Sequence, residues 1–307
     1  MRKITLCLVS AALFFAGSLA CHAVPIADLS EISDLGGSYE LTADAVLPDD
    51  FTPIGSADAP FTGKFDGGGH TVSISGKAGL FGAAENAEIR NVSVIGTASG
   101  KSTVGGIVSA AKGTIIENCS FDGYLTPDVS GFTAYAGGIA GTTDKKTVLR
   151  NCVVNVKVTL ADTAYRTNIG GIVGYAYHAS LGGCTSRAGR AADYEYTQAD
   201  RSRLRGRYVG GIAGYCDGSV LYRCSTGADG YVLGSEYVGG IVGGADEGAN
   251  RLLLHDGTAR VTSNASCVIG NSYVGGIIGR NSGGSAIENC VNTGVAAGYQ
   301  AYIGGIC

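Results

Sequence analysis

Apolar residues recur along the chain in a pattern built on paired glycines. A Gly-Gly pair that follows an apolar or small residue and precedes isoleucine occurs seven times. The pairs begin at Gly105, Gly137, Gly170, Gly210, Gly239, Gly275 and Gly304. They are 29 to 40 residues apart. A fixed motif at variable spacing predicts one repeated scaffold that carries loops of different lengths.

A second fixed position lies 14 or 15 residues after the first glycine of a pair. It holds Cys119, Cys152, Cys184, Cys224 and Cys290. In the repeat that begins at Gly239, Leu253 or Leu254 stands there instead. A position that accepts cysteine or leucine is a buried apolar one, because buried cysteine behaves as a small hydrophobe. We therefore predict that the five cysteines form a structural core column. Stacked side chains pointing the same way fit disulfide geometry poorly.

Apolar anchors are three residues apart at two places in a repeat, as at Val209 and Ile212 and at Ile116 and Cys119, whereas side chains of a strand alternate with period two. A corner must therefore separate them. Gly-Gly stands at the first corner, and Asn118, Asn151, Gly183 or Asn289 precedes the cysteine at the second. Glycine and asparagine tolerate positive φ, and Arg223 is the exception in this set. Each repeat is therefore expected to be a coil of short strands, stacked about 4.8 Å from its neighbours.

The fold class predicted is all-β, a right-handed parallel β-helix (β-solenoid) with a short N-terminal helical cap. Apolar spacing over residues 24–37 suits one short helix, and a cap of residues 24–60 would cover the edge of the first coil. Residues 61–307 would form the solenoid. The sequence ends at Cys307 inside the seventh motif, from which we expect a truncated solenoid or a missing downstream domain.

The first 23 residues have the pattern of a signal peptide. Arg2 and Lys3 precede an apolar run from Ile4 to Ala16, which is too short to span a bilayer. The segment from Ser18 to Cys21 loosely resembles a lipoprotein box, so Cys21 is a candidate for lipidation. We expect an exported protein, at the cell surface or secreted, that contacts a membrane only through such an anchor.

The composition of the chain limits the classes of partner that it is expected to bind. Charged residues make up 16% of the chain and the formal net charge is −4, which does not favour nucleic-acid binding. Hydrophobic residues reach 45%, so disorder is not expected, and the 51 glycines suit short strands joined by tight turns. No residue pattern indicates a metal or cofactor.

The repeats resemble the GLUG motif of bacterial surface proteins. The resemblance is carried by segments such as Tyr208-Val-Gly-Gly-Ile-Ala-Gly214 and Ile287-Glu-Asn-Cys290, and it covers roughly residues 40–307. Similar repeats accompany immunoglobulin A-cleaving zinc peptidases, whose H-E-x-x-H motif is absent here. The resemblance implies an adhesin-like surface solenoid and carries over no catalytic residue.

Two groups of residues are candidates for ligand binding. Tyrosines stand two residues before the Gly-Gly pair at Tyr135, Tyr208, Tyr237, Tyr273 and Tyr302. They predict either an aromatic strip for sugar rings or a self-stacking ladder that stiffens the surface. The longest spacing carries Arg201, Arg203, Arg205 and Arg207. This segment is either a binding loop or a solvated loop with internal ion pairs.

Three functions remain open at this point. The first is a non-enzymatic surface scaffold that binds host or matrix glycans or surface proteins. The second is a carbohydrate-binding or polysaccharide-lyase-type β-helix, although the clustered acids of a lyase are not evident in the sequence. The third is the non-catalytic N-terminal part of a larger surface peptidase.

Overall fold

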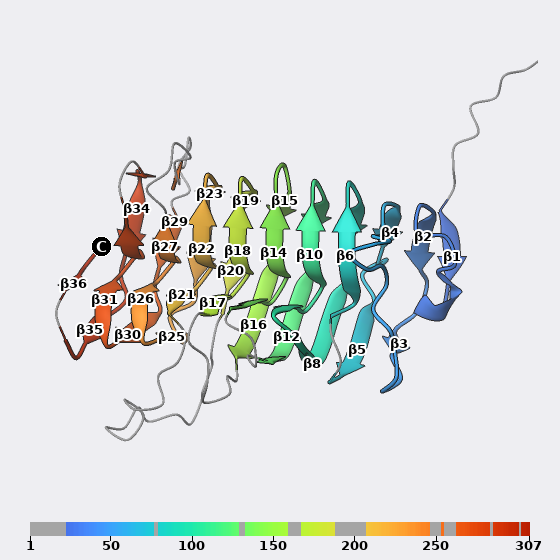
Figure 1. Ribbon diagram of the computed structural model, residues 1–307, viewed down its shortest axis with the longest axis horizontal. Coiled ribbons are helices and arrows are strands. Elements are labelled where there is room, and N and C mark those ends of the chain that lie inside the picture. Colours follow the sequence, from blue (N-terminus) through green and yellow to red (C-terminus); the bar gives the residue numbers. More distant parts are fainter. Residues whose placement is uncertain are drawn as a thin grey trace, which may run out of the picture.

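The chain forms a stack of parallel strands. The computed structural model describes residues 23–76, 79–128, 133–158, 167–187, 207–245, 253–254, 262–282, 285–300 and 302–307. Within these ranges each strand pairs in parallel with the equivalent strand of the next coil, and the coils follow one another along the long axis from β1 to β36 (Figure 1). The all-β class and the parallel solenoid are confirmed.

A complete coil passes through four sheets in a fixed order, named sheets I to IV here, and the C-terminal coils add a short fifth, sheet V, between sheet IV and the next strand of sheet I. Sheet I contains β9 (Thr103–Gly105), β13 (Ala134–Gly137), β17 (Thr167–Gly170), β21 (Tyr208–Gly210), β26 (Glu236–Gly239), β31 (Ser272–Gly275) and β36 (Ile303–Gly304). Sheet II contains β6 (Phe81–Glu85), β10 (Val108–Lys112), β14 (Ala140–Asp144), β18 (Val173–Tyr177), β22 (Ala213–Asp217), β27 (Val242–Ala245) and β32 (Ile278–Asn281).

The other sheets close the cross-section. Sheet III contains β1 (Val24–Ile26), β2 (Ser38–Leu41), β4 (Lys64–Asp66), β7 (Glu88–Arg90), β11 (Ile115–Glu117), β15 (Val148–Arg150), β19 (Ser180–Gly182), β23 (Val220–Tyr222), β28 (Leu253–Leu254) and β33 (Ala286–Ile287). Sheet IV contains β3 (Ala45–Val46), β5 (Thr71–Ser75), β8 (Ser93–Lys101), β12 (Ser120–Asp128), β16 (Val153–Val158), β20 (Thr185–Ser186), β24 (Ser225–Thr226), β29 (Thr262–Asn264) and β34 (Cys290–Asn292). Sheet V contains β25 (Tyr231–Leu233), β30 (Cys267–Gly270) and β35 (Ala296–Gly298).

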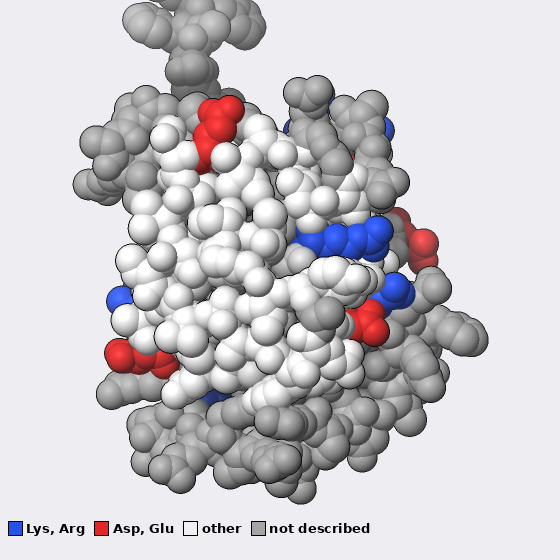
Figure 2. Space-filling model, turned by 90° about the vertical axis from the view of Figure 1, so that its left-hand side faces the viewer, with Lys and Arg blue, Asp and Glu red and all other residues white. Residues whose placement is uncertain are grey.

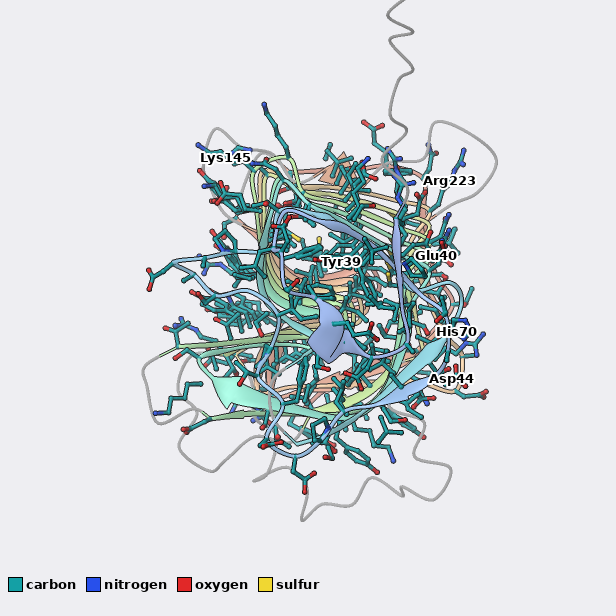
Figure 3. The ribbon with its side chains drawn as sticks, turned by 90° about the vertical axis from the view of Figure 1, so that its right-hand side faces the viewer. Tyr39, Glu40, Asp44, His70, Lys145 and Arg223 are labelled. Carbon is teal, nitrogen blue, oxygen red and sulfur yellow. The ribbon has the colours of Figure 1, made fainter. Side chains whose placement is uncertain are left out.

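The helix predicted over residues 24–37 is wrong. Residues 24–26 form β1, which pairs with β2 in sheet III, and one 3-10 turn, η1 (Leu29–Glu31), follows. Asp28 starts this turn: its side chain accepts a hydrogen bond from the Ser30 amide at 2.7 Å. Such local side-chain bonds favour a turn over a continued helix. Tyr39 of β2 lies over the middle of the first coil (Figure 3) and its hydroxyl bonds the Asp34 backbone.

Neighbouring coils bury the apolar column of the core. The isoleucines that follow six of the Gly-Gly pairs, from Ile107 to Ile277, are fully buried, whereas Ile306 after the seventh is 40% exposed. Figure 2 looks onto the end of the stack that carries β36 and shows few charged side chains there. Burial of this column therefore depends on the next coil.

No helix in the described ranges is long and apolar enough to cross a bilayer.

At the Gly-Gly corners, backbone atoms approach the glycines too closely for any side chain to fit. None of these paired glycines has a positive φ, so an explanation from left-handed backbone does not hold for them. A Cβ on the first glycine of each pair would lie 1.8 to 2.2 Å from the carbonyl oxygen three residues later. On the second glycine of the first six pairs, it would lie 2.1 to 2.6 Å from the carbonyl oxygen of the equivalent glycine in the next coil. Any side chain would therefore force the corner or the coils apart.

The second corner, between sheets III and IV, does use left-handed backbone. The predicted positions have φ of 54° at Asn118, 52° at Asn151, 65° at Gly183 and 51° at Asn289. Arg223 is no exception, because its φ is 55°. The asparagines also bond between coils: Asn118 Nδ2 donates to Asn91 Oδ1 at 3.1 Å, and Asn151 Nδ2 donates to Asn118 Oδ1 at 3.3 Å. We call this column the asparagine ladder.

Candidate functional site

Four of the five tyrosines singled out in the sequence form a continuous stack on sheet I. Backbone register aligns Val209, Val238, Val274 and Ile303, so the tyrosine before each of them faces the next. Ring centroids are 4.8 Å apart between Tyr208 and Tyr237, 4.9 Å between Tyr237 and Tyr273, and 4.8 Å between Tyr273 and Tyr302. These separations lie in the range of attractive aromatic contacts.

Sheet II adds two tyrosines that the sequence reasoning missed. Asn168 interrupts the sheet I column between Tyr135 and Tyr208. Tyr175 and Tyr215 bridge this interruption: Tyr175 contacts Tyr135 at 5.6 Å, Tyr215 stacks on Tyr175 at 5.9 Å, and Tyr208 meets Tyr215 edge-on at 4.7 Å. Both lie five residues after the first glycine of a pair, which is the signal that could have found them. We call these seven residues, from Tyr135 to Tyr302, the tyrosine strip.

Two arginines contact the strip. The Arg280 Nη1 donates to the Tyr208 hydroxyl at 3.3 Å, and its guanidinium lies 5.2 Å from the Tyr237 ring centroid. The Arg207 guanidinium lies 5.6 Å from the ring centroids of both Tyr208 and Tyr237, and its Nε is 3.4 Å from Glu236 Oε2. The contacts between these guanidinium groups and the tyrosine rings are cation–π interactions. Arg201, Arg203 and Arg205 lie outside the described residues.

The guanidinium of Arg280 is held in its charged form. Burial lowers its pKa, but the Tyr208 hydroxyl and the nearby Tyr237 and Tyr215 raise it, with a net rise. Glycine at position 244, the sheet II neighbour of Arg280, leaves room for this arrangement, since a Cβ there would lie 2.5 Å from the Tyr208 ring. The strip therefore combines ring edges, hydroxyls and fixed positive charge.

Three tyrosines of the strip occupy the left-handed region of backbone space. Their φ values are 47° at Tyr237, 53° at Tyr273 and 71° at Tyr302. A bulky residue rarely adopts this conformation, which costs of order 1 kcal/mol or more. Tyr273 and Tyr302 are 37% and 69% exposed. The chain thus keeps strained, partly exposed aromatic residues in register over consecutive coils, a combination that favours a binding role.

The cysteine column lies in the core, away from this surface. Strand register aligns Cys119, Cys152, Cys184 and Cys224, then Thr262, then Cys290. The first four are buried, Cys290 is half-buried, and all five are free thiols. Each of the first four donates to a carbonyl of the preceding coil, as Cys119 Sγ does to Ile89 O at 3.7 Å. Burial raises the pKa of Cys119 to about 12, so this thiol stays protonated and unreactive.

One alignment from the sequence is wrong. Leu254 pairs with Leu221 and Ile287, so neither it nor Leu253 takes the cysteine position in its coil. The buried Thr262 takes that position instead, because the chain between β28 and β29 is longer than in other coils.

Cys21 lies outside the described residues. No group of three or more metal-ligating side chains occurs among the residues described.

Comparison with known proteins agrees with this architecture. The GLUG motif family matches residues 270–296. This segment runs from the last residue of β30 to the first residue of β35, so one motif corresponds to one complete coil. A search of curated proteins finds no match.

Two solved structures resemble the chain. An IgA1 protease aligns with a TM-score of 0.56 and 18% identity, over 83% of this chain and 20% of that one. A putative immunoglobulin A1 protease from Bacteroides ovatus aligns with a TM-score of 0.48 and 22% identity, over 87% of this chain and 76% of that one. The chain thus spans about a fifth of the length of the first of these proteins, and the likeness concerns the fold.

Proposed function

We propose that this chain, which carries the GLUG motif on a parallel β-solenoid, is the non-enzymatic binding surface of an exported bacterial protein. Its tyrosine strip would bind glycans of a host or matrix surface. The observation that carries the proposal is the unbroken run of tyrosines over two sheets, with Arg207 and Arg280 against its middle. A rigid solenoid is a suitable support, because preorganised groups bind with a smaller entropic cost.

The chemistry of the strip suits a polar ring ligand. Because the rings of Tyr208, Tyr237, Tyr273 and Tyr302 occupy one another's faces, they offer edges and hydroxyls to a ligand. Hydroxyls donate and accept hydrogen bonds, and guanidinium groups donate them, which matches the hydroxyls of a saccharide. Export through the signal peptide of residues 1–23, with or without lipidation at Cys21, would bring this surface outside the cell.

The test is a glycan array with the full chain and a Tyr237→Asn variant. Asparagine is chosen because Asn168 already occupies this column and because it tolerates a left-handed backbone. We expect the variant to bind its best glycan at least about fivefold more weakly, the order of one lost aromatic or cation–π contact. Tyr124→Asn is the control, since Tyr124 is 48% exposed on sheet IV. Unchanged binding by Tyr237→Asn, or an equal loss in the control, would reject the strip as the site.

A second candidate is favoured by the structural likeness. The chain aligns with one fifth of an IgA1 protease chain, so it would serve as the non-catalytic part of a larger surface peptidase. Sequencing the gene beyond Cys307 tests this: an open reading frame with H-E-x-x-H would support it, and an immediate stop codon would reject it. The lyase alternative is tested by incubating the chain with polyuronates and measuring unsaturated products, which we expect to be absent.

A further inference from the structure

A surface depression of about 480 Å³ lies at the corner between sheets III and IV, away from the tyrosine strip. It exists because the sequence places glycine at two consecutive positions, Gly182 and Gly183. In the preceding coil the equivalent residues are Arg150 and Asn151, and in the following coil they are Tyr222 and Arg223. The asparagine ladder therefore stops at Gly183, and the Tyr222 ring lies over Gly182 at one side of the depression.

The side chains around this space are cationic, aromatic and hydrogen-bonding. Arg150 borders it from one coil, and Arg223 with Tyr222 borders it from the other. The Tyr222 ring lies against Gly182, where a Cβ would approach it to 2.2 Å. Thr185 and Ser225 line the floor with hydroxyls 3.1 Å apart. None of the described residues that line the depression is acidic.

Arg150 reaches the depression as the last member of a column of alternating charges on sheet III. Register aligns Asp66, Arg90, Glu117 and Arg150, then Gly182. Arg90 contacts Glu88 of its own strand at 3.3 Å and Glu117 of the next coil at 3.7 Å, so Glu117 lies between Arg90 and its other register neighbour, Arg150. Arg150 is the last charged residue of the column before the space opens.

We propose that this depression binds an acidic saccharide through its carboxylate or sulfate group. Arg150 and Arg223 would pair with the anionic group, since guanidinium groups bind carboxylate and sulfate oxygens with charge-assisted hydrogen bonds. Tyr222 would pack against the sugar ring, and Thr185 and Ser225 would bond its hydroxyls. The site does not depend on the tyrosine strip and uses none of its residues.

A single substitution closes the depression without breaking the corner. In Gly183→Asn the new side chain would continue the asparagine ladder at a φ of 65°, close to the 52° of Asn151 and the 54° of Asn118. The added Cβ would lie 2.7 Å from Asn151 Oδ1 and 3.9 Å from the Asn151 backbone nitrogen, so only the end of the Asn151 side chain must shift, while its Nδ2 keeps its bond to Asn118. We expect Gly183→Asn to fold with an unchanged melting temperature and to lose binding. Arg150→Gln tests the charge and should weaken binding about tenfold.

Calorimetric titration of the full chain provides the measurement. The probes are a heparin-derived tetrasaccharide, trigalacturonate, maltotriose as the neutral analogue, and inorganic sulfate. Binding of either acidic saccharide but not of maltotriose, lost in Gly183→Asn, supports the proposal, and the tighter probe identifies sulfate or carboxylate as the group recognised.

Lys145→Gln is the matched control, because Lys145 lies at a different corner from Arg223 (Figure 3). Like Arg150→Gln, this substitution removes one positive charge. An equal loss in Lys145→Gln would mean diffuse electrostatic attraction and would overturn the proposal. So would binding of inorganic sulfate with no binding of either acidic saccharide, binding that survives Gly183→Asn, or no binding of any probe.

Discussion

The first glycine of each pair should tolerate no side chain, and Gly210→Ala tests this most sharply. The new Cβ would lie 2.0 Å from the carbonyl oxygen of Ala213 and 2.7 Å from the amide nitrogen of Gly243. Both are backbone atoms of the same or the next coil, so no side-chain rotation relieves the contact. Since real Cβ atoms essentially never come closer than 3.0 Å, the backbone must open by about 1 Å.

The energetic consequence follows from the hydrogen bonds at this corner. The bonds from Gly171 N to Gly210 O and from Gly211 N to Gly239 O are already 3.2 and 3.3 Å long. An opening of about 1 Å would remove both, at about 1 kcal/mol each, and overpacking adds about 1 to 3 kcal/mol. We therefore expect Gly210→Ala to lower the free energy of unfolding by about 3 to 5 kcal/mol.

Urea unfolding followed by circular dichroism measures this loss. The control is Gly227→Ala, where the nearest atoms beyond the chain neighbours are 3.8 and 3.9 Å away and no positive φ is required. This variant should unfold within about 0.5 kcal/mol of the parent chain. Equal stability of the two variants, at the same dependence on urea, would refute the close-approach explanation of the repeat.

Two further perturbations have definite expected outcomes. Asn118→Ala should lower the free energy of unfolding by about 1 to 2 kcal/mol, because alanine is strained at a φ of 54° and the asparagine ladder is broken. Asn118→Gly should recover the part of this loss that comes from backbone strain. Thermal melts in which the glycine variant is no more stable than the alanine variant would contradict the backbone argument. Stability should also fall above about pH 9: the pKa of Cys119 is about 12 when folded against 9.0 otherwise, so only the unfolded thiol ionises, at about 1.4 kcal/mol by pH 10. A urea midpoint that stays constant between pH 8 and pH 10 would show that the Cys119 thiol is not buried in the folded state.

The parts of the fold that were predictable are those that demand a residue type at every coil. Gly-Gly at the first corner recurs because of close approach, isoleucine after it recurs because that position is buried, and asparagine recurs at most second corners because few residues tolerate left-handed backbone. Arg223 shows that the backbone geometry persists even where the sequence departs from the preferred type. Repetition thus reveals the steric requirements of a coil.

Features that occur in only one or two coils were harder to assign from the sequence, even where their spacing was visible in it. Tyr175 and Tyr215 occur in only two coils of sheet II, and their role appears only when Asn168 is placed beside them. The inner column of sheet IV changes from Phe121 and Val154 to Ser186, Thr226 and Asn264. There the Thr226 hydroxyl bonds Asn264 at 2.5 Å and Asn264 Nδ2 bonds Asn292 at 2.7 Å. Such a buried polar ladder depends on register across insertions of unequal length.

The helix predicted over residues 24–37 was wrong for a different reason. A brief apolar run fits a helix or a strand equally well when only its spacing is considered. Pairing of Val24 and Ile26 with β2 decided for the strand, which is a tertiary contact that local spacing does not contain.

The central claim is that successive coils stack in register, and distances between spin labels along sheet III test it most directly. Labels carried on non-natural amino acids at Glu40 and Arg150 are separated by four coil steps, and labels at Glu40 and Tyr222 by six. At about 4.8 Å per step, the backbone separations should be about 19 and 29 Å. Pulsed electron paramagnetic resonance should therefore find the second pair about 10 Å farther apart than the first, and equal or reversed distances would contradict the stack.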